Sequence, residues 1–122
     1  MEAWKWEKEL GEATVFLIEK DGEIVGNAGY ENCGNGLFYL NRMVIDPRFQ
    51  RKGIGRLVLG KLLDDMKGAK RIELVTHPDN VAALKLYQSV GFVIESRKEN
   101  YYGDGEPRLT LVRDENKDST EI

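Results

Sequence analysis

The chain has 122 residues, enough for one domain with a single hydrophobic core, and a formal net charge of −3 at pH 7. This charge disfavours a general nucleic-acid binder, and no apolar run is long enough to cross a bilayer, which disfavours a membrane partner. The first ten residues show no basic leader followed by an apolar stretch, so we expect a cytoplasmic protein without a signal peptide.

Cysteine and histidine each occur once, as Cys33 and His77. A single cysteine cannot form an internal disulfide, and nothing in the sequence marks a partner base that would make it a catalytic thiol. One histidine excludes a multi-histidine metal site, and His77 is better interpreted as a loop residue than as a catalytic base. We therefore expect no metal cofactor.

The N-terminal third of the chain predicts a short helix followed by a sheet. Residues 2–10 mix Trp4, Trp6 and Leu10 with charged residues, a pattern that we interpret as a short amphipathic helix ending at Gly11. Three segments rich in β-branched and aromatic residues follow, with turn signals between them. They predict an antiparallel meander of strands: 13–20, 23–30 and 37–45.

The apolar spacing then changes to that of a helix. Residues 54–67 place their apolar side chains along one helical face, and residues 71–77 predict a strand. Because a helix joins them, strands 37–45 and 71–77 should be parallel and connected by a right-handed crossover.

The C-terminal third predicts a second helix and two strands. The helix begins at Asp79 or Asn80, either of which can cap it, and ends at Gly91. The strands are 92–100 and 107–114. We expect one domain over residues 1–122, with residues 114–122 as a frayed polar tail, and a mixed α/β fold.

The segment that opens the first long helix has the features of an anion site. Gly53 and Gly55 allow a ligand to approach the backbone closely, and a helix N-terminus offers unpaired N–H groups at the positive end of its dipole. Arg51 and Lys52 add positive charge. A bound phosphate is the favoured interpretation, and a tight turn with solvated cations is the alternative.

Two separate motifs resemble the signatures of one enzyme superfamily. The segment "VIDPRFQRKGIG" (44–55) fits the pattern Q/R-x-x-G-x-G/A, and "NVAALKLYQSVGF" (80–92) is similar to N-x-x-A-x-x-L-Y-x-x-x-G-F. Both occur, in this order and spacing, in the GNAT superfamily of acetyl-CoA-dependent N-acetyltransferases. The resemblance covers residues 13–113. It implies a mostly antiparallel sheet flanked by helices, with one parallel, splayed strand pair.

The resemblance also implies where acetyl-CoA would bind. The pantetheine arm would pair with backbone groups of strand 37–45, and the glycine loop would hold the pyrophosphate. Asn80 would contact the cosubstrate from the second helix, and Tyr87 would protonate the departing thiolate as a general acid, with a core aromatic as its other interpretation. The remaining implied binding residues are Met43, Val44, Ile45, Gln50, Arg51, Lys52, Gly53, Ile54, Gly55 and Arg56.

Acetyl transfer to an amine also needs a proton acceptor and an oxyanion donor. Glu73 is the first candidate for the base, because a glutamate is unusual among apolar neighbours at mid-strand; the alternative is a solvated or ion-paired strand residue. Asn41 could position a water in the acceptor cleft. The N–H group of Val44 or Ile45 is a candidate oxyanion donor.

The sequence departs from the family pattern at its N-terminal end. The first strand and at least one helix of the family, which form one wall of the acceptor site, are expected to be missing. The edge of strand 13–20 would then be exposed, which favours a homodimer. The end "RKENYYGDGEPRLTL" (97–111) resembles a stretch of relatives that acetylate protein N-termini.

The leading prediction is an N-acetyltransferase for a primary amine: a small molecule, a polyamine or a protein N-terminus. Two alternatives are a non-catalytic acetyl-CoA-binding module and a structural phosphate-loop protein without acyl chemistry. The presence of Tyr87 and Glu73 favours the enzyme over the binding module, and the paired motifs disfavour the structural protein.

Overall fold

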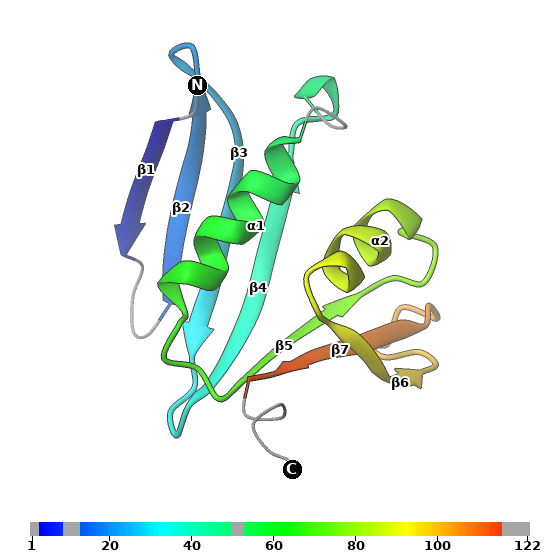
Figure 1. The fold of residues 1–122 in the computed structure, drawn as a ribbon. Coiled ribbons are helices and arrows are strands. Elements are labelled where there is room, and N and C mark those ends of the chain that lie inside the picture. The colour runs from blue at the N-terminus through cyan, green and yellow to red at the C-terminus, as the bar shows by residue number, and fades with distance from the viewer. Residues whose placement is uncertain (1–2, 9–12, 50–52, 116–122) are drawn as a thin grey trace.

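The computed structural model describes residues 3–8, 13–49 and 53–115. Over these residues the chain forms one seven-stranded sheet in the order β1-β2-β3-β4-β5-β7-β6, together with two α-helices and one 3-10 turn (Figure 1). The elements are β1 (Ala3–Lys8), β2 (Ala13–Lys20), β3 (Glu23–Asn32), β4 (Leu37–Ile45), η1 (Pro47–Phe49), α1 (Ile54–Asp65), β5 (Arg71–Thr76), α2 (Val81–Ser89), β6 (Val93–Lys98) and β7 (Arg108–Asp114).

The prediction of a helix over residues 2–10 is wrong, because Ala3–Lys8 is strand β1. It pairs antiparallel with β2, from Ala3 opposite Glu19 to Lys8 opposite Thr14. In "AWKWEK" each tryptophan alternates with a charged residue, which is the period of a strand rather than a helix, and tryptophan favours strands.

Strand β1 also overturns the expectation that the family's first strand is missing. It occupies the edge of β2 that was expected to be exposed, so the basis for the predicted homodimer is wrong. The described residues contain no α-helix before β4, and only residues 9–12 separate β1 from β2.

The sheet divides into two halves that meet at β4 and β5. These strands run parallel and pair at only three positions: Leu37 with Arg71, Phe38 with Ile72, and Tyr39 with Glu73. Beyond these pairs the strands diverge, as Figure 1 shows. The predicted parallel, splayed strand pair is therefore confirmed, and it opens the sheet at the C-terminal ends of both strands.

A β-bulge lies in β4 at the start of this opening. Tyr30 of β3 pairs with Leu40, whereas its neighbour Gly29 pairs with Arg42, so Asn41 is the extra residue on β4. A bulge bends its strand and changes the direction of the side chains that follow it. Two consecutive β4 residues, Asn41 and Arg42, are accordingly exposed.

Both helices pack into one hydrophobic core on the same side of the sheet. Figure 1 shows α1 running across β2, β3 and β4, with α2 beside β5. Helix α1 buries Ile54, Val58, Leu59 and Leu62, the face that its apolar spacing predicts. Tyr30 of β3 ties the helix to the sheet, because its hydroxyl lies 2.5 Å from a carboxylate oxygen of Asp65.

No helix of the described part of the chain is both long enough and apolar enough to span a membrane.

Candidate active site

A cavity of about 560 Å³ lies where β4 and β5 separate. Five parts of the molecule surround it: the two strands, the N-terminus of α1, one side of α2 and the loop between β6 and β7. Its described lining consists of Tyr39, Leu40, Asn41, Arg42, Met43, Ile45, Gly53, Gly55, Arg56, Leu74, Val75, Thr76, Asn80, Ala82, Ala83, Leu86, Tyr87 and Tyr102. The structure thus brings most of the predicted site residues together.

The N-terminus of α1 opens on this cavity without a side-chain cap. Gly53 precedes the helix with a φ of 80°, a left-handed conformation that favours glycine, and no side chain caps the first turn. Leu57 donates to the carbonyl of Gly53, so the N–H groups of the three residues before it have no helical partner. The first turn also lacks acidic residues. This end of α1 is therefore suited to an anion.

The missing side chain of Gly55 leaves room between α1, α2 and β4. A Cβ built there would lie 3.4 Å from Leu86 Cδ2 and 4.0 Å from Met43 Cε. A small side chain could fit against these atoms, whereas a large one would enter the cavity. The predicted contacts of Gln50, Arg51 and Lys52 lie outside the described residues.

The N-terminus of α2 differs, because Asn80 caps it. The Asn80 side chain accepts a hydrogen bond from the Ala83 N–H at 3.3 Å, and Asn80 also lines the cavity. Its amide therefore has a structural role in addition to the predicted contact with a cosubstrate.

Tyr87 projects from α2 into the core beside the cavity. Its side chain is buried and meets Phe92 edge-on, with 5.8 Å between the ring centroids. Burial raises the pKa of Tyr87 to about 12, so its phenol keeps its proton at neutral pH. The structure agrees with the interpretation of Tyr87 as a core aromatic that borders the cavity, and its role as a general acid stays a prediction.

Strand β4 supplies the third wall. Asn41, Met43 and Ile45 line the cavity, whereas the Val44 side chain is 53% exposed and does not. Since β5 leaves β4 after Tyr39, no described strand pairs with the β5-facing edge of β4 between Leu40 and Val44. Backbone groups along this edge can therefore pair with an extended ligand.

Glu73, the predicted base, lies outside the cavity lining. Its carboxylate is 2.8 Å from Arg71 Nε, and the same guanidinium reaches Glu95 at 2.7 Å. Val75, two residues further along the same face of β5, lines the cavity instead. The geometry supports the alternative interpretation of Glu73 as an ion-paired strand residue.

Sequence reasoning missed two tyrosines at the cavity. Tyr39 lies on β4 at the last parallel pair, and Tyr102 comes from the loop between β6 and β7. Burial raises the pKa of Tyr39 to about 12, with a smaller contribution from the neighbouring Tyr102. The doublet Tyr101-Tyr102 in a glycine-rich turn was the available signal, but only the fold brings it to β4.

Residues 1–92 match the sequence model of the acetyltransferase (GNAT) family. This match covers more than half of the chain, so the chain belongs to the GNAT family, as its two motifs indicated.

Curated relatives include N-alpha-acetyltransferase RimI of Mycobacterium tuberculosis, 37% identical over 97 residues, which are 76% of this chain and 61% of that protein. The [ribosomal protein bS18]-alanine N-acetyltransferase of Salmonella typhimurium is 38% identical over 65 residues, which are 52% of this chain and 44% of that protein. The matched part of the chain thus spans 61% and 44% of the length of these two relatives.

Solved structures show the same fold. The ribosomal-protein-S18-alanine N-acetyltransferase of Escherichia coli is 25% identical with a TM-score of 0.79, covering 93% of this chain and 77% of that one. A Bacillus subtilis acetyltransferase in complex with CoA gives a TM-score of 0.81 at 15% identity, covering 93% and 99%. At that identity the likeness shows the fold alone.

Proposed function

We propose that the protein transfers the acetyl group of acetyl-CoA to the α-amine of a peptide or protein N-terminus. The observation that carries this proposal is the cavity, because it joins an uncapped helix N-terminus to the splayed edge of β4 and a buried, protonated tyrosine. A protein that only bound a phosphate would need the first feature but not the other two.

The described residues fit acetyl-CoA. The N–H groups at the start of α1 can donate hydrogen bonds to a pyrophosphate, and Arg56 adds a positive charge at the cavity wall. Between Leu40 and Val44 the β5-facing edge of β4 can pair with the amides of an extended pantetheine arm, as an added strand would. Bound acetyl-CoA would supply a thioester carbonyl for direct attack by an amine.

Tyr87 is the candidate general acid. A phenol with a pKa of about 12 is protonated at neutral pH and can give its proton to a leaving thiolate. The backbone N–H of Val44 or Ile45 stays the candidate donor for negative charge that develops on the carbonyl oxygen. Asn41, turned by the bulge, lines the cavity and can hold a water near the entering amine.

The cavity favours an acceptor amine of low pKa. Its described lining includes no carboxylate and no imidazole that could take a proton from an ammonium group. An α-amine has a pKa near 8 and is about one-tenth neutral at pH 7, whereas a lysine amine is neutral in only about one molecule in 2,500. An α-amine therefore needs less help from a base, which agrees with the N-terminal acceptors in the names of the relatives.

Tyr39 and Tyr102 form the acceptor side of the cavity in this proposal. Both line the cavity, Tyr39 from β4 and Tyr102 from the loop between β6 and β7. Aromatic side chains with hydroxyl groups can both pack against a peptide and bond its backbone. We further propose that the reaction takes place in the cytoplasm, needs no metal, and involves neither nucleic acid nor membrane.

A panel of amines tests the proposal. The protein is incubated with acetyl-CoA and, in turn, a peptide with a free N-terminus, the same peptide with a blocked N-terminus, a polyamine and lysine. We expect release of free thiol with the free peptide at a rate at least about tenfold above the others. Tight binding of acetyl-CoA with no thiol release for any amine would instead support the binding module.

A further inference from the structure

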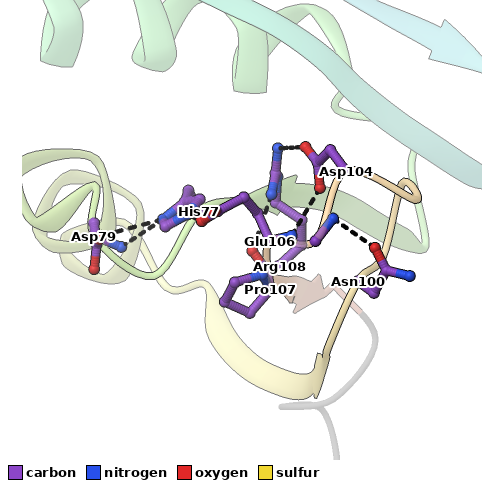
Figure 2. Close-up of polar contacts among 8 residues, drawn as sticks. His77, Asp79, Asn100, Asp104, Glu106, Pro107 and Arg108 are labelled. Atoms are coloured by element: carbon purple, nitrogen blue, oxygen red, sulfur yellow. Dashed lines mark hydrogen bonds and ion pairs between the residues drawn. The ribbon is translucent and has the colours of Figure 1, made fainter.

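A polar contact joins the loop after β5 to the loop between β6 and β7, and each loop carries a residue of the cavity lining. His77 lies between β5 and α2, and Glu106 lies between β6 and β7. His77 Nε2 is 2.9 Å from Glu106 Oε1, and the Asp79 N–H donates to His77 Nδ1, also at 2.9 Å (Figure 2). The imidazole ring of His77 thereby links two loops that are distant in sequence.

These bonds fix the proton on the ring. Nδ1 accepts from a backbone N–H, so in the neutral imidazole the proton is on Nε2. An ionised carboxylate can only accept, so Nε2–H donates to Glu106. Both ring nitrogens are therefore engaged, which sets the orientation of the ring as well as its tautomer.

The β6–β7 loop is braced internally and so can move as a unit. Asn100 Oδ1 accepts from the Gly105 N–H at 2.6 Å, and Asp104 accepts from the Glu106 N–H at 2.9 Å. Arg108 reaches the same aspartate at 3.1 Å. Figure 2 shows these bonds within the loop and the separate bond from Glu106 to His77. The internal bonds hold the loop's shape, whereas His77 holds its position relative to α2.

The position of this loop matters because it carries Tyr102 to the cavity. On the other side, Thr76 and Asn80 flank the His77 segment, and both line the same cavity. A shift of the loop away from α2 would move Tyr102 relative to Tyr39, the tyrosine of β4 that lines the same cavity. The cavity would then widen on the acceptor side while the start of α1 stayed unchanged.

We propose that His77 is a positioning residue that, through Glu106, sets the width of the acceptor entrance and thus the affinity for the acceptor. The proposal rests on the proposed acetyltransferase function for its kinetic consequences, but its structural content does not. His77 touches neither reacting group in this account and acts through the loop that carries Tyr102.

The contact between His77 and Glu106 should affect the position of the β6–β7 loop more than the global stability of the fold. The side chains of His77 and Glu106 are 28% and 56% exposed, and partly solvated polar pairs contribute little to global stability. Variants at these positions should therefore fold, which makes their kinetics interpretable.

Kinetics of His77→Ala, Glu106→Ala and the double variant test the role. We expect each to raise KM for the peptide acceptor by about tenfold, the scale of one lost hydrogen bond to a charged group, with KM for acetyl-CoA within about twofold and kcat within about threefold. The double variant should equal either single variant, because both break one contact. Additive losses, an equal rise in both KM values, or an unchanged acceptor KM would overturn the proposal.

Two matched variants separate this contact from general effects. Glu106→Gln keeps an oxygen that can accept from Nε2–H, so it should stay within about threefold of the wild type. Glu99→Ala removes a carboxylate from the same hairpin whose ion pair, with Arg97 at 2.6 Å, does not cross to the α2 side. It should leave the acceptor KM unchanged. A tenfold rise in Glu99→Ala would show that any charge loss on this hairpin suffices and would refute the specific role of His77.

A measurement that needs no turnover distinguishes failure of this inference from failure of the proposed function. Nitrogen NMR of the wild-type protein near pH 8 should show His77 protonated on Nε2 and unprotonated on Nδ1. Hydrogen exchange of residues 100–106 should be faster in His77→Ala than in wild type by about tenfold, with α1 unchanged. The opposite tautomer, or unchanged exchange, would reject the positioning role of His77 even if acetylation is confirmed. If both results are as expected but no acetyl transfer occurs, only the proposed function is rejected.

Discussion

The two helices begin beside the same cavity but in different ways. Helix α1 follows Gly53, which has a left-handed conformation and provides no side-chain cap. Helix α2 follows Asn80, whose side chain accepts from the Ala83 N–H. The N-terminus of α1 borders the cavity without a side-chain cap, whereas the N-terminus of α2 is capped by its own chain.

The difference separates two kinds of contribution to the site. Helix α1 offers backbone donors and the absence of a side chain at Gly55, both of which suit an anion. The N-terminus of α2 is capped by Asn80, and the helix contributes side chains from one face to the cavity, among them Leu86 and Tyr87. We therefore expect changes in α1 to alter binding and the loss of the Tyr87 hydroxyl to alter the chemical step.

The largest effect is expected for Tyr87→Phe. Removal of the hydroxyl leaves the ring contact with Phe92 but takes away the proton donor, so kcat should fall by ~10² or more, the usual scale for a lost general acid. The affinity for acetyl-CoA should stay within a few-fold. Steady-state kinetics with a confirmed acceptor, and calorimetric titration, measure the two quantities.

Tyr30→Phe is the matched control for this prediction. Tyr30 is also buried, and its pKa is also raised to about 12, first by burial and then by Asp65, but it faces α1 rather than the cavity. Its loss should lower stability and leave kcat nearly unchanged. A Tyr87→Phe enzyme with near-normal kcat would remove the tyrosine from the mechanism.

Next in size is the effect of a bulky residue at the start of α1. Gly55→Leu should weaken acetyl-CoA binding by at least ~2 kcal/mol, about 30-fold, since its side chain would enter the cavity beside Leu86 and Met43. Gly55→Ala should have a much smaller effect, because its Cβ meets those atoms at ordinary contact distance. Calorimetric titration of acetyl-CoA measures both.

Gly60→Leu controls for the change in helix propensity. Gly60 lies on the same helix, and a Cβ there meets nothing within 4 Å. It should bind acetyl-CoA like the wild type. Unchanged affinity in a folded Gly55→Leu protein would contradict the role assigned to the start of α1.

A smaller effect is expected at the other helix N-terminus. Asn80→Ala removes the cap of α2 and should lower the free energy of unfolding by ~1 kcal/mol. Asn80→Asp keeps a capping oxygen, so stability should be preserved. Its negative charge should lower the affinity for the anionic acetyl-CoA several-fold if Asn80 also contacts it. Chemical denaturation and acetyl-CoA titration separate the two roles, and equal acetyl-CoA affinity in Asn80→Asp and wild type would limit Asn80 to capping.

The smallest effect on turnover is expected for Glu73→Gln. Its carboxylate is paired with Arg71 outside the cavity lining, so kcat should stay within about threefold while stability falls by at most ~1 kcal/mol. Arg71 retains Glu95, which limits the loss. A fall of kcat by ~10² would restore Glu73 as the base and contradict the geometric argument.

Most of the fold could be predicted, because its elements carry strong local signals. The strand at 37–45 and the start of α1 at Ile54 match the structure, since alternation and helical spacing change sharply at Pro47. The hairpin at Asp21-Gly22 follows from residues that tolerate positive φ, which both adopt. The splayed strand pair followed from the family resemblance rather than from any local pattern.

What could not be predicted depends on contacts between distant segments. The strand Ala3–Lys8 is defined by its pairing with β2, and its alternating pattern covers only six residues. The extra residue Asn41 is visible only against its partner Tyr30 on β3. Tyr102 lines the same cavity as Tyr39 although it lies 102 − 39 = 63 positions later in the chain, and Glu73 pairs with Arg71 outside the cavity lining.

The central claim is that the cavity joins acetyl-CoA to an N-terminal α-amine, and acetylation of two alanine-starting peptides tests it most directly. Both contain one lysine, and one has a blocked N-terminus. After incubation with the protein and acetyl-CoA, fragment mass spectrometry locates any acetyl group. The account predicts one acetyl group on the α-amine of the free peptide and none on the blocked one. Acetylation of lysine in both peptides, or tight acetyl-CoA binding with no acetylated peptide, would contradict it.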